Sequence, residues 1–277
     1  MSASSPDFRS LPGPVVLVGA GKMGGALLAG WLRFGLDPAQ VAVIEPKPAP
    51  PIAALAELGV RFNPNPHEMS DAAAIVIAVK PQIATDALPA ITPMLGASTL
   101  VISIMAGRTL QFLSGALPRA VAFVRAMPNV AAGIGRGITV AVPQSASETQ
   151  RQLAHHLLSA AGTVAWVEDE TLLDAVTAVS GSGPAYVFLL VEALAQAGVA
   201  AGLPQALAEQ LARETVAGSG ELLHQSKLDA AALRESVTSP GGTTAAALEV
   251  LMGTNGLAPL MSKAIAAATA RSRKLAG

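Results

Sequence analysis

Short apolar runs recur along the first part of the chain and alternate with segments of helical spacing. The expected strands are residues 15–18, 41–44, 74–79, 99–104, 120–125, 138–142 and 163–167. Helical patterns lie between several of them, including residues 26–34, 51–58 and 147–161. This alternation predicts an α/β fold with a mostly parallel sheet that helices cover on both faces.

Strand patterns stop near residue 171, and Ala, Leu and Glu then recur at helical spacing up to Leu275. The acidic turn Glu168-Asp169-Glu170 suits the start of a helix. We therefore expect a disordered lead over residues 1–13, an α/β domain over 14–168 and an all-helical domain over 169–277. The segment 180–184, SGSGP, is expected to interrupt the helical pattern and to restart a helix.

A glycine-rich turn, GAGKMG at residues 19–24, joins the first expected strand to the first helix. Strand, GxGxxG and helix in this order are the context that a dinucleotide-binding fingerprint requires. Gly19 makes the tight turn, Gly21 admits a pyrophosphate, and Gly24 lets the helix pack closely on the strand. The turn predicts a Rossmann-type dinucleotide site.

Two charged residues near the end of the second strand bear on the choice of dinucleotide. Glu45 lies 21 residues after Gly24, where an acidic residue accepts hydrogen bonds from the ribose 2′-OH of NAD. Lys47 favours the opposite choice, because an ammonium attracts the 2′-phosphate of NADP. Both NADH and NADPH therefore remain open as cofactors, and simple pairing of Glu45 with Lys47 in solvent is the structural alternative.

The segment SPGGTT at residues 239–244 opens onto a helical stretch over 245–251. Unpaired N–H groups and the helix dipole attract anions, and glycines let an anion approach the backbone. The segment therefore favours a pocket for a small carboxylate with hydroxyl groups beside it. A Pro-Gly turn followed by a Thr cap is the plain structural alternative.

Three further loops follow expected strands: AVKPQ at 78–82, SIMAG at 103–107 and RAMPN at 125–129. Ligands of open parallel sheets bind beyond the carboxyl ends of the strands. Ordinary strand-to-helix loops are the alternative for each one, but three such loops together favour a cofactor crevice.

Composition narrows the function classes. The 277 residues contain no cysteine, so disulfides and thiolate chemistry are excluded, and the net charge of −1 provides no basic field for nucleic acid. None of the four histidines has metal-ligand spacing, so no metal is expected. Only 13% of residues are charged and the mean hydropathy is +0.49, which predicts apolar surface buried between subunits.

The most apolar window, residues 185–203, is expected at the centre of that subunit interface. A membrane span is the competing interpretation, but the window contains Glu192 and Gln196 and has no basic flanks. The polar residues 1–14 have no apolar signal region. We expect a cytoplasmic protein without membrane or nucleic-acid partners.

The motifs GAGKMG, AVKPQ, RAMPN, VSGSGPAYVF and SPGGTT together resemble the pyrroline-5-carboxylate reductase family, from about residue 14 to the end. This family reduces Δ1-pyrroline-5-carboxylate to L-proline with NADPH or NADH, in the last step of proline biosynthesis. Its members join an N-terminal Rossmann domain to a C-terminal helical dimerisation domain and often assemble into decamers. The resemblance implies that residues 14–168 bind the dinucleotide and that residues 169–277 bind substrate and form a homodimer.

The resemblance also implies roles for single residues. The implied cofactor-binding residues are Gly19, Gly21, Lys22 and Met23 in the phosphate loop, Ala78, Val79, Lys80 and Pro81 in the crevice, and Met127, Pro128 and Asn129 near the nicotinamide. The implied substrate-binding residues are Ser239, Gly241, Gly242, Thr243 and Thr244. The hydroxyl of Thr244 is expected against the ring nitrogen as the catalytic group. Packing is the expected role of Tyr186, with proton donation left open.

Two rival functions fit part of the pattern. A β-hydroxyacid dehydrogenase shares the layout but needs a catalytic lysine on the first helix of the second domain, and residues 170–203 contain no lysine. A non-catalytic dinucleotide-binding regulatory protein would keep the phosphate loop but would need no SPGGTT segment.

Overall fold

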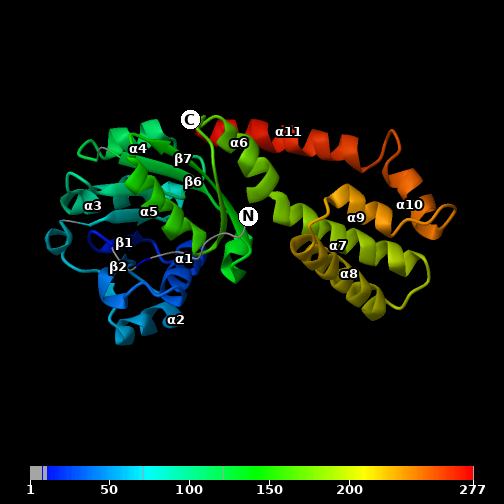
Figure 1. The fold of residues 1–277 in the computed structure, drawn as a ribbon, viewed down its shortest axis with the longest axis horizontal. Coiled ribbons are helices and arrows are strands. Elements are labelled where there is room, and N and C mark those ends of the chain that lie inside the picture. The colour runs from blue at the N-terminus through cyan, green and yellow to red at the C-terminus, as the bar shows by residue number, and fades with distance from the viewer. Residues whose placement is uncertain (1–7, 9–10, 71, 121, 277) are drawn as a thin grey trace. The chain divides into compact units, whose positions relative to one another are not determined.

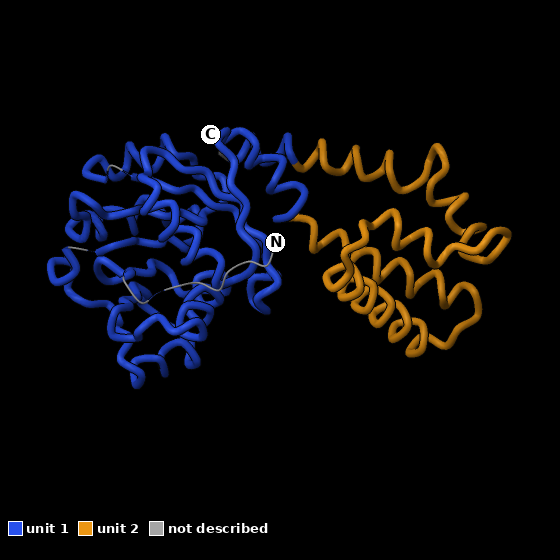
Figure 2. Tube along the Cα trace, viewed as in Figure 1, with its two compact units in different colours: residues 1–181, 269–277 blue, residues 182–268 orange. Residues whose placement is uncertain are grey.

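The computed structural model describes residue 8 and residues 11–70, 72–120 and 122–276. The chain forms two compact units: residues 1–181 with 269–277, and residues 182–268 (Figure 2). Most of the expected disordered lead, residues 1–13, lies outside the described residues. Phe8, which is described, is buried in the core of the first unit.

One eight-stranded sheet organises the first unit, in the order β3-β2-β1-β4-β5-β6-β7-β8 (Figure 1). The strands are β1 (Val15–Val18), β2 (Val41–Ile44), β3 (Arg61–Phe62), β4 (Ala74–Ile77), β5 (Leu100–Ser103), β6 (Ala122–Met127), β7 (Gly137–Gln144) and β8 (Gly162–Trp166). Neighbours are parallel except β6 and β7, which are antiparallel. The expected mostly parallel α/β fold is confirmed.

Helices cover both faces of this sheet. They are α1 (Lys22–Arg33), α2 (Pro50–Ala53), α3 (Ala84–Ile91), α4 (Leu110–Ala116) and α5 (Glu148–Ser159), followed by α6 (Leu172–Val176). Apolar side chains of α1 and α5 pack with one set of alternate strand residues, and those of α3, α4 and α6 pack with the other set. The result is a three-layer domain whose interior is almost entirely apolar.

The strand order reverses between β1 and β4, and this point determines where a ligand binds. Val18 at the end of β1 lies opposite Ile44 of β2 and Ile77 of β4. The loops after these three strands therefore emerge side by side at the carboxyl edge of the sheet.

The second unit is helical, as expected. It contains α7 (Gly183–Ala200), α8 (Gln205–Gln225), α9 (Ala230–Ser236), α10 (Thr243–Leu251) and the first part of α11 (Leu257–Ala276). The α7–α8 hairpin turns at Gly202, whose φ is +99°. Small residues let the two helices approach closely, because a Cβ at Gly198 would lie 3.2 Å from the Ala208 Cβ.

Three details correct the sequence expectations. The strand β3 has only two residues and was not expected. The segment expected to be a helix over 51–58 is α-helical only in α2 and continues as a 3-10 helix over Ala54–Leu58. The expected helix restart in 180–184 is confirmed, because α7 begins at Gly183 with Ser182 as its N-cap and Pro184 in its first turn, where an N–H has no partner in the helix. The expected break before it is absent, because a π-helix over Thr177–Gly181 connects α6 to α7.

Candidate active site

In the turn between β1 and α1, the packing of the surrounding protein leaves no room for a side chain at two of the glycines. Gly19 has φ +93°, and a Cβ there would lie 2.9 Å from the Ala78 carbonyl. Gly24 packs so closely on the carbonyl oxygen of Gly19 that no side chain fits. These contacts bind the start of α1 to the ends of β1 and β4.

Gly21 differs from its neighbours, because a Cβ there would meet no protein atom within 4 Å. Its φ of −70° and ψ of −162° are also open to other residues. Gly21 is the N-cap of α1, where backbone N–H groups and the helix dipole favour an anion. Glycine at this position thus fits the close approach of a pyrophosphate, and the turn fits a dinucleotide.

The turn contributes to a cavity of about 460 Å³ at the carboxyl edge of the sheet. Its lining residues are Gly21, Lys22, Met23, Ala78, Val79, Lys80, Pro81, Ile104, Met105 and Ala106. The structure therefore brings together Gly21, Lys22 and Met23 of the turn and the loop residues 78–81, whereas Gly19, Gly24 and Gln82 do not line this cavity. The residues from β5 onward, Ile104 to Ala106, were noted only as a motif.

Arg108 holds one of the residues that line this cavity, Pro81, and was not predicted from the sequence. Its Nε and Nη2 donate hydrogen bonds of 3.2 and 2.8 Å to the carbonyl oxygen of Pro81. Its guanidinium lies 4.6 Å from the centre of the Phe112 ring. Arg108 thus ties the loop after β5 to the loop after β4.

Glu45 occupies the expected place at the end of β2. Its Oε2 accepts a hydrogen bond of 3.1 Å from the Ala20 N–H, and its Oε1 accepts one of 3.1 Å from the Lys47 N–H. The contact with Lys47 is therefore to the backbone. The carboxylate connects the glycine-rich turn to the loop after β2.

The three residues expected near the nicotinamide lie at and after the end of β6 and do not line the 460 Å³ cavity. Asn129 accepts a hydrogen bond of 3.3 Å from the Ile138 N–H, which holds the start of β7. The terminal methyl of Met127 fills the space beside Gly181, where a Cβ would be 2.7 Å away.

In the second unit, SPGGTT forms a turn that leads directly into α10. The Gly242 N–H donates a hydrogen bond of 3.0 Å to the Ser239 carbonyl, and Gly241 has φ +69°. Gly242 is the N-cap, so the alternative of a Thr cap is wrong, and Thr243 and Thr244 occupy the first turn. Within the described part of the chain, no side-chain hydrogen bond involves either hydroxyl. Thr244 is half-buried, and Thr243 is exposed.

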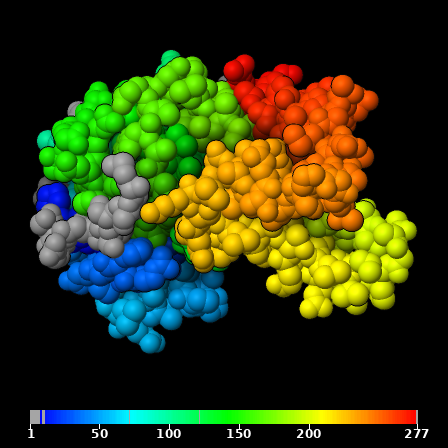
Figure 3. All heavy atoms as spheres, turned by 45° about the vertical axis from the view of Figure 1, so that its right-hand side comes forward, coloured from blue at the N-terminus to red at the C-terminus, as the bar shows by residue number. Residues whose placement is uncertain are grey.

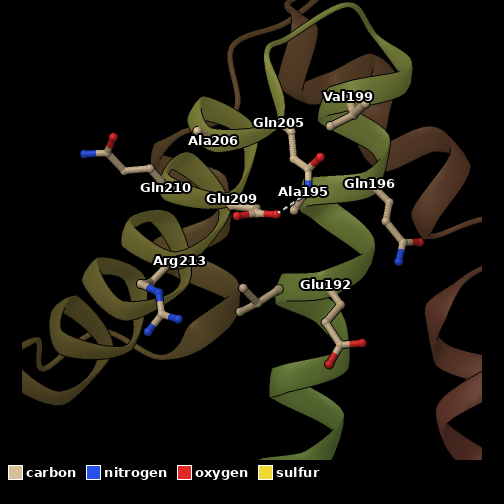
Figure 4. Close-up of a pocket in the computed structure, with 10 residues that line it drawn as sticks. Glu192, Ala195, Gln196, Val199, Gln205, Ala206, Glu209, Gln210 and Arg213 are labelled. Atoms are coloured by element: carbon tan, nitrogen blue, oxygen red, sulfur yellow. Dashed lines mark hydrogen bonds between the residues drawn. The ribbon is translucent and has the colours of Figure 1, made fainter.

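The second unit exposes many large apolar side chains, and Figure 3 shows part of the surface of this unit in yellow and orange. Exposed large apolar side chains occur along α7, α8, α10 and α11, among them Phe188, Leu189, Leu211, Leu222, Val250 and Leu260. A groove of about 860 Å³ runs between α7 and α8, and Gln205 and Glu209 hydrogen-bond beside it (Figure 4). Tyr186 is half-buried in the first turn of α7.

Two further findings, on metal ions and on membranes, concern the described residues. No group of three or more His, Asp or Glu side chains there is placed to hold a metal ion. One continuous helical segment, Leu172–Ala200, is long and apolar enough to span a membrane, with a mean hydropathy of 1.4. A helix at a subunit interface has the same composition.

Comparison with known proteins gives consistent matches. A family model described as "Pyrroline-5-carboxylate reductase dimerisation" matches residues 170–275, and one described as "NADP oxidoreductase coenzyme F420-dependent" matches residues 14–107. The chain is 40% identical over 263 residues to a pyrroline-5-carboxylate reductase of Synechocystis, covering 94% of this chain and 97% of the relative.

Solved structures agree with these matches. A pyrroline-5-carboxylate reductase of Coxiella burnetii superposes with a TM-score of 0.88 at 32% identity, covering 96% of this chain and 99% of the other. A pyrroline carboxylate reductase of Plasmodium falciparum with NADP bound superposes with a TM-score of 0.78 at 28% identity, with the same coverage of both chains.

Proposed function

The chain belongs to the pyrroline-5-carboxylate reductase family, and from this premise we propose how its residues reduce Δ1-pyrroline-5-carboxylate to L-proline. The enzyme is an NAD(P)H-dependent imine reductase of proline biosynthesis. The observation that carries the assignment of its cofactor site is Gly21, a glycine at a helix N-terminus that no packing contact requires.

Residues 14–168 bind the dinucleotide in this proposal. The N-terminal turn of α1, with Gly19, Gly21, Lys22, Met23 and Gly24, receives the phosphates. The loop residues Ala78 to Pro81 line the crevice, Met127 to Asn129 lie towards the nicotinamide, and Glu45 and Lys47 lie towards the adenosine ribose. A bound nicotinamide supplies the hydride that the reaction needs.

Residues 169–277 hold the substrate and the partner subunit in this proposal. The N–H groups at the start of α10 hold the substrate carboxylate, with Ser239 and the glycines of SPGGTT shaping the turn. The hydride adds to the carbon of the ring C=N bond, and the electron pair of that bond moves to nitrogen, which takes up a proton from water. The Thr244 hydroxyl donates a hydrogen bond to this nitrogen while its basicity rises.

An absorbance assay tests the reaction. The purified protein should oxidise NADPH or NADH when pyrroline-5-carboxylate is added, and should not reduce NAD+ or NADP+ when a β-hydroxy acid is added. Activity on the hydroxy acid with none on the imine would instead favour the dehydrogenase class, against which the absence of lysine from residues 170–203 argues.

The chain assembles with copies of itself, and we propose a dimer centred on residues 185–203, with decamers built from such dimers. Burying the exposed side chains of α7 removes apolar surface from water, which drives association. Leu189→Glu should shift the protein towards monomer in light scattering. Leu58→Glu in the first unit is the matched control, because both leucines are 62% exposed. A parent protein that stays monomeric at micromolar concentration would refute the dimer.

We also propose that the enzyme works in the cytoplasm, with a small-molecule substrate and with neither nucleic acid nor membrane as partner. The net charge of −1 supports the absence of nucleic acid. Cell fractionation tests the location, and recovery in the membrane fraction would contradict it.

A further inference from the structure

The end of β2 is held by an unusual side-chain contact from the residue that follows β3. Asn63 Nδ2 donates a hydrogen bond of 3.0 Å to the Glu45 carbonyl, and Asn63 Oδ1 accepts one of 2.9 Å from the Glu45 N–H. The Asn63 N–H also donates to the Val43 carbonyl at 2.8 Å. One amide side chain thus fixes both backbone polar groups of Glu45, where the pairing of β2 with β3 has already ended.

This contact requires an uncommon backbone conformation. Asn63 has φ +47°, and only one other described residue that is not glycine, Ser145, has a positive φ. Asparagine tolerates this region better than most residues, but the conformation still has an energetic cost. One hydrogen bond to Val43 of β2 and two to Glu45, which follows β2, hold Asn63 in this conformation.

The consequence falls on the Glu45 carboxylate. Its backbone is fixed by Asn63, and each of its oxygens accepts one hydrogen bond, from Ala20 and from Lys47. A carboxylate has about four lone-pair sites, so acceptor capacity remains for hydroxyl groups of a ligand. Because Asn63 holds its backbone and Ala20 and Lys47 hold its two oxygens, the Glu45 carboxylate cannot rotate away from a negatively charged ligand.

We propose that Asn63 is a positioning residue that fixes Glu45 and thereby makes the site prefer the 2′-hydroxyl dinucleotide, NADH, over NADPH. The ribose hydroxyls find an acceptor at the end of β2, whereas a 2′-phosphate meets a carboxylate of like charge. This proposal rests on the proposed function only in assigning the dinucleotide to the turn between β1 and α1.

Binding measurements without the imine test it. Calorimetry on the full chain compares ADP-ribose with 2′-phospho-ADP-ribose, two fragments that lack the nicotinamide. The parent should bind ADP-ribose at least about tenfold more tightly, since tenfold corresponds to about 1.4 kcal/mol. Glu45→Ser should remove most of this preference.

Asn63→Gly isolates the positioning role, because glycine accepts φ +47° without the side chain. The preference for ADP-ribose should fall at least about threefold, since one neutral hydrogen bond contributes about 0.5–1.5 kcal/mol. Ser145→Gly is the matched control, because Ser145 has φ +57° and lies between β7 and α5, and it should keep the parent preference. A merely structural weakening would lower both affinities together and leave their ratio unchanged.

Two outcomes would overturn the proposal: a parent that binds 2′-phospho-ADP-ribose as tightly as ADP-ribose, or a folded Asn63→Gly variant with the parent ratio. If Asn63→Gly fails to fold, Asn63→Ser carries the same expectation, because its hydroxyl is too short to bridge both Glu45 groups. The assay with pyrroline-5-carboxylate is separate. A parent that prefers ADP-ribose but does not reduce the imine contradicts the proposed reaction and leaves this inference standing.

Discussion

Two glycines of the same turn should respond in opposite ways to the same substitution. Gly24→Ala places a methyl group against the carbonyl oxygen of Gly19 and 3.1 Å from the Ala78 Cβ. Gly21→Ala places a methyl group where no protein atom lies within 4 Å. The pair therefore separates what the fold requires of the turn from what a bound dinucleotide requires.

The structure sets the magnitudes. Gly19 cannot move away from a new methyl group easily, because its N–H donates to the Ile44 carbonyl at 2.9 Å and the Ala78 carbonyl leaves no room for even a Cβ on Gly19. Overpacking of this kind costs about 1–3 kcal/mol, or a fall in Tm of about 2–12 °C. For Gly21→Ala, the loss of a favourable N-cap glycine and the lower entropy of the unfolded chain are each below about 1 kcal/mol and of opposite sign. Its Tm should change by no more than about 2 °C.

The assay is thermal unfolding at a fixed protein concentration, combined with NADH binding followed by fluorescence. Gly21→Ala should keep the parent Tm but bind NADH at least about tenfold more weakly, because the methyl group occupies the approach of the pyrophosphate. Gly24→Ala should instead lower the Tm. If Gly21→Ala binds NADH as the parent does, the turn is not the phosphate site. If Gly24→Ala is as stable as the parent, the close packing of α1 is not the reason for that glycine.

Three further outcomes are expected. Thr244→Ala should lower turnover far more than it weakens NADH binding, and Thr244→Ser should keep a good part of the turnover. Parent-like turnover of the alanine variant would show that the hydroxyl does not assist at the ring nitrogen. Arg108→Met should raise the Kd for NADH several-fold, because its two hydrogen bonds to the Pro81 carbonyl are lost. An unchanged Kd would show that the loop after β4 keeps its conformation without Arg108. Burial, and then the charge of His156, keep the pKa of His155 below its ordinary value of 6.5, so the folded state favours the neutral ring. This contribution is complete above pH 6.5 and is lost as the pH falls through the lowered pKa. Tm should therefore fall less below pH 6.5 in His155→Gln, and parallel Tm curves would contradict this.

The strands buried on both faces were the most predictable part of the fold. The continuous apolar runs of β1 and β2 gave their observed bounds, because a central parallel strand has no polar face. The strand β3 gave no such signal, because it has two residues at the sheet edge and neither is buried. The SGSGP segment predicted the start of α7 correctly, but its glycines and proline also resemble a break, and the π-helix before α7 keeps the chain helical there.

The candidate site was predictable where its contacts are local in sequence. The GAGKMG turn is a single continuous segment whose glycines carry the signal. Arg108 and Asn63 act on residues 27 and 18 positions away, and nothing in their neighbours indicates this. The helix start expected at Glu168-Asp169-Glu170 is confirmed, since α6 begins at Leu172. Nothing in the sequence indicates that the Glu170 carboxylate also accepts hydrogen bonds from the Arg125 guanidinium at 2.7 Å and the Leu110 N–H at 2.8 Å. Such long-range pairs depend on the fold being formed.

These long-range contacts share one location and one consequence. Glu45 bonded to Ala20, Asn63 bonded to Glu45 and Arg108 bonded to Pro81 all hold loops at the carboxyl edge of an otherwise apolar sheet. These loops are therefore already ordered in the folded protein, so the binding of a dinucleotide does not include the entropy cost of ordering them. It follows that changes to these anchors should appear mainly as weaker cofactor binding, with turnover recovering at saturating cofactor. A change at Thr244 acts on the reacting nitrogen in the proposed mechanism, so saturation with cofactor should not restore its turnover.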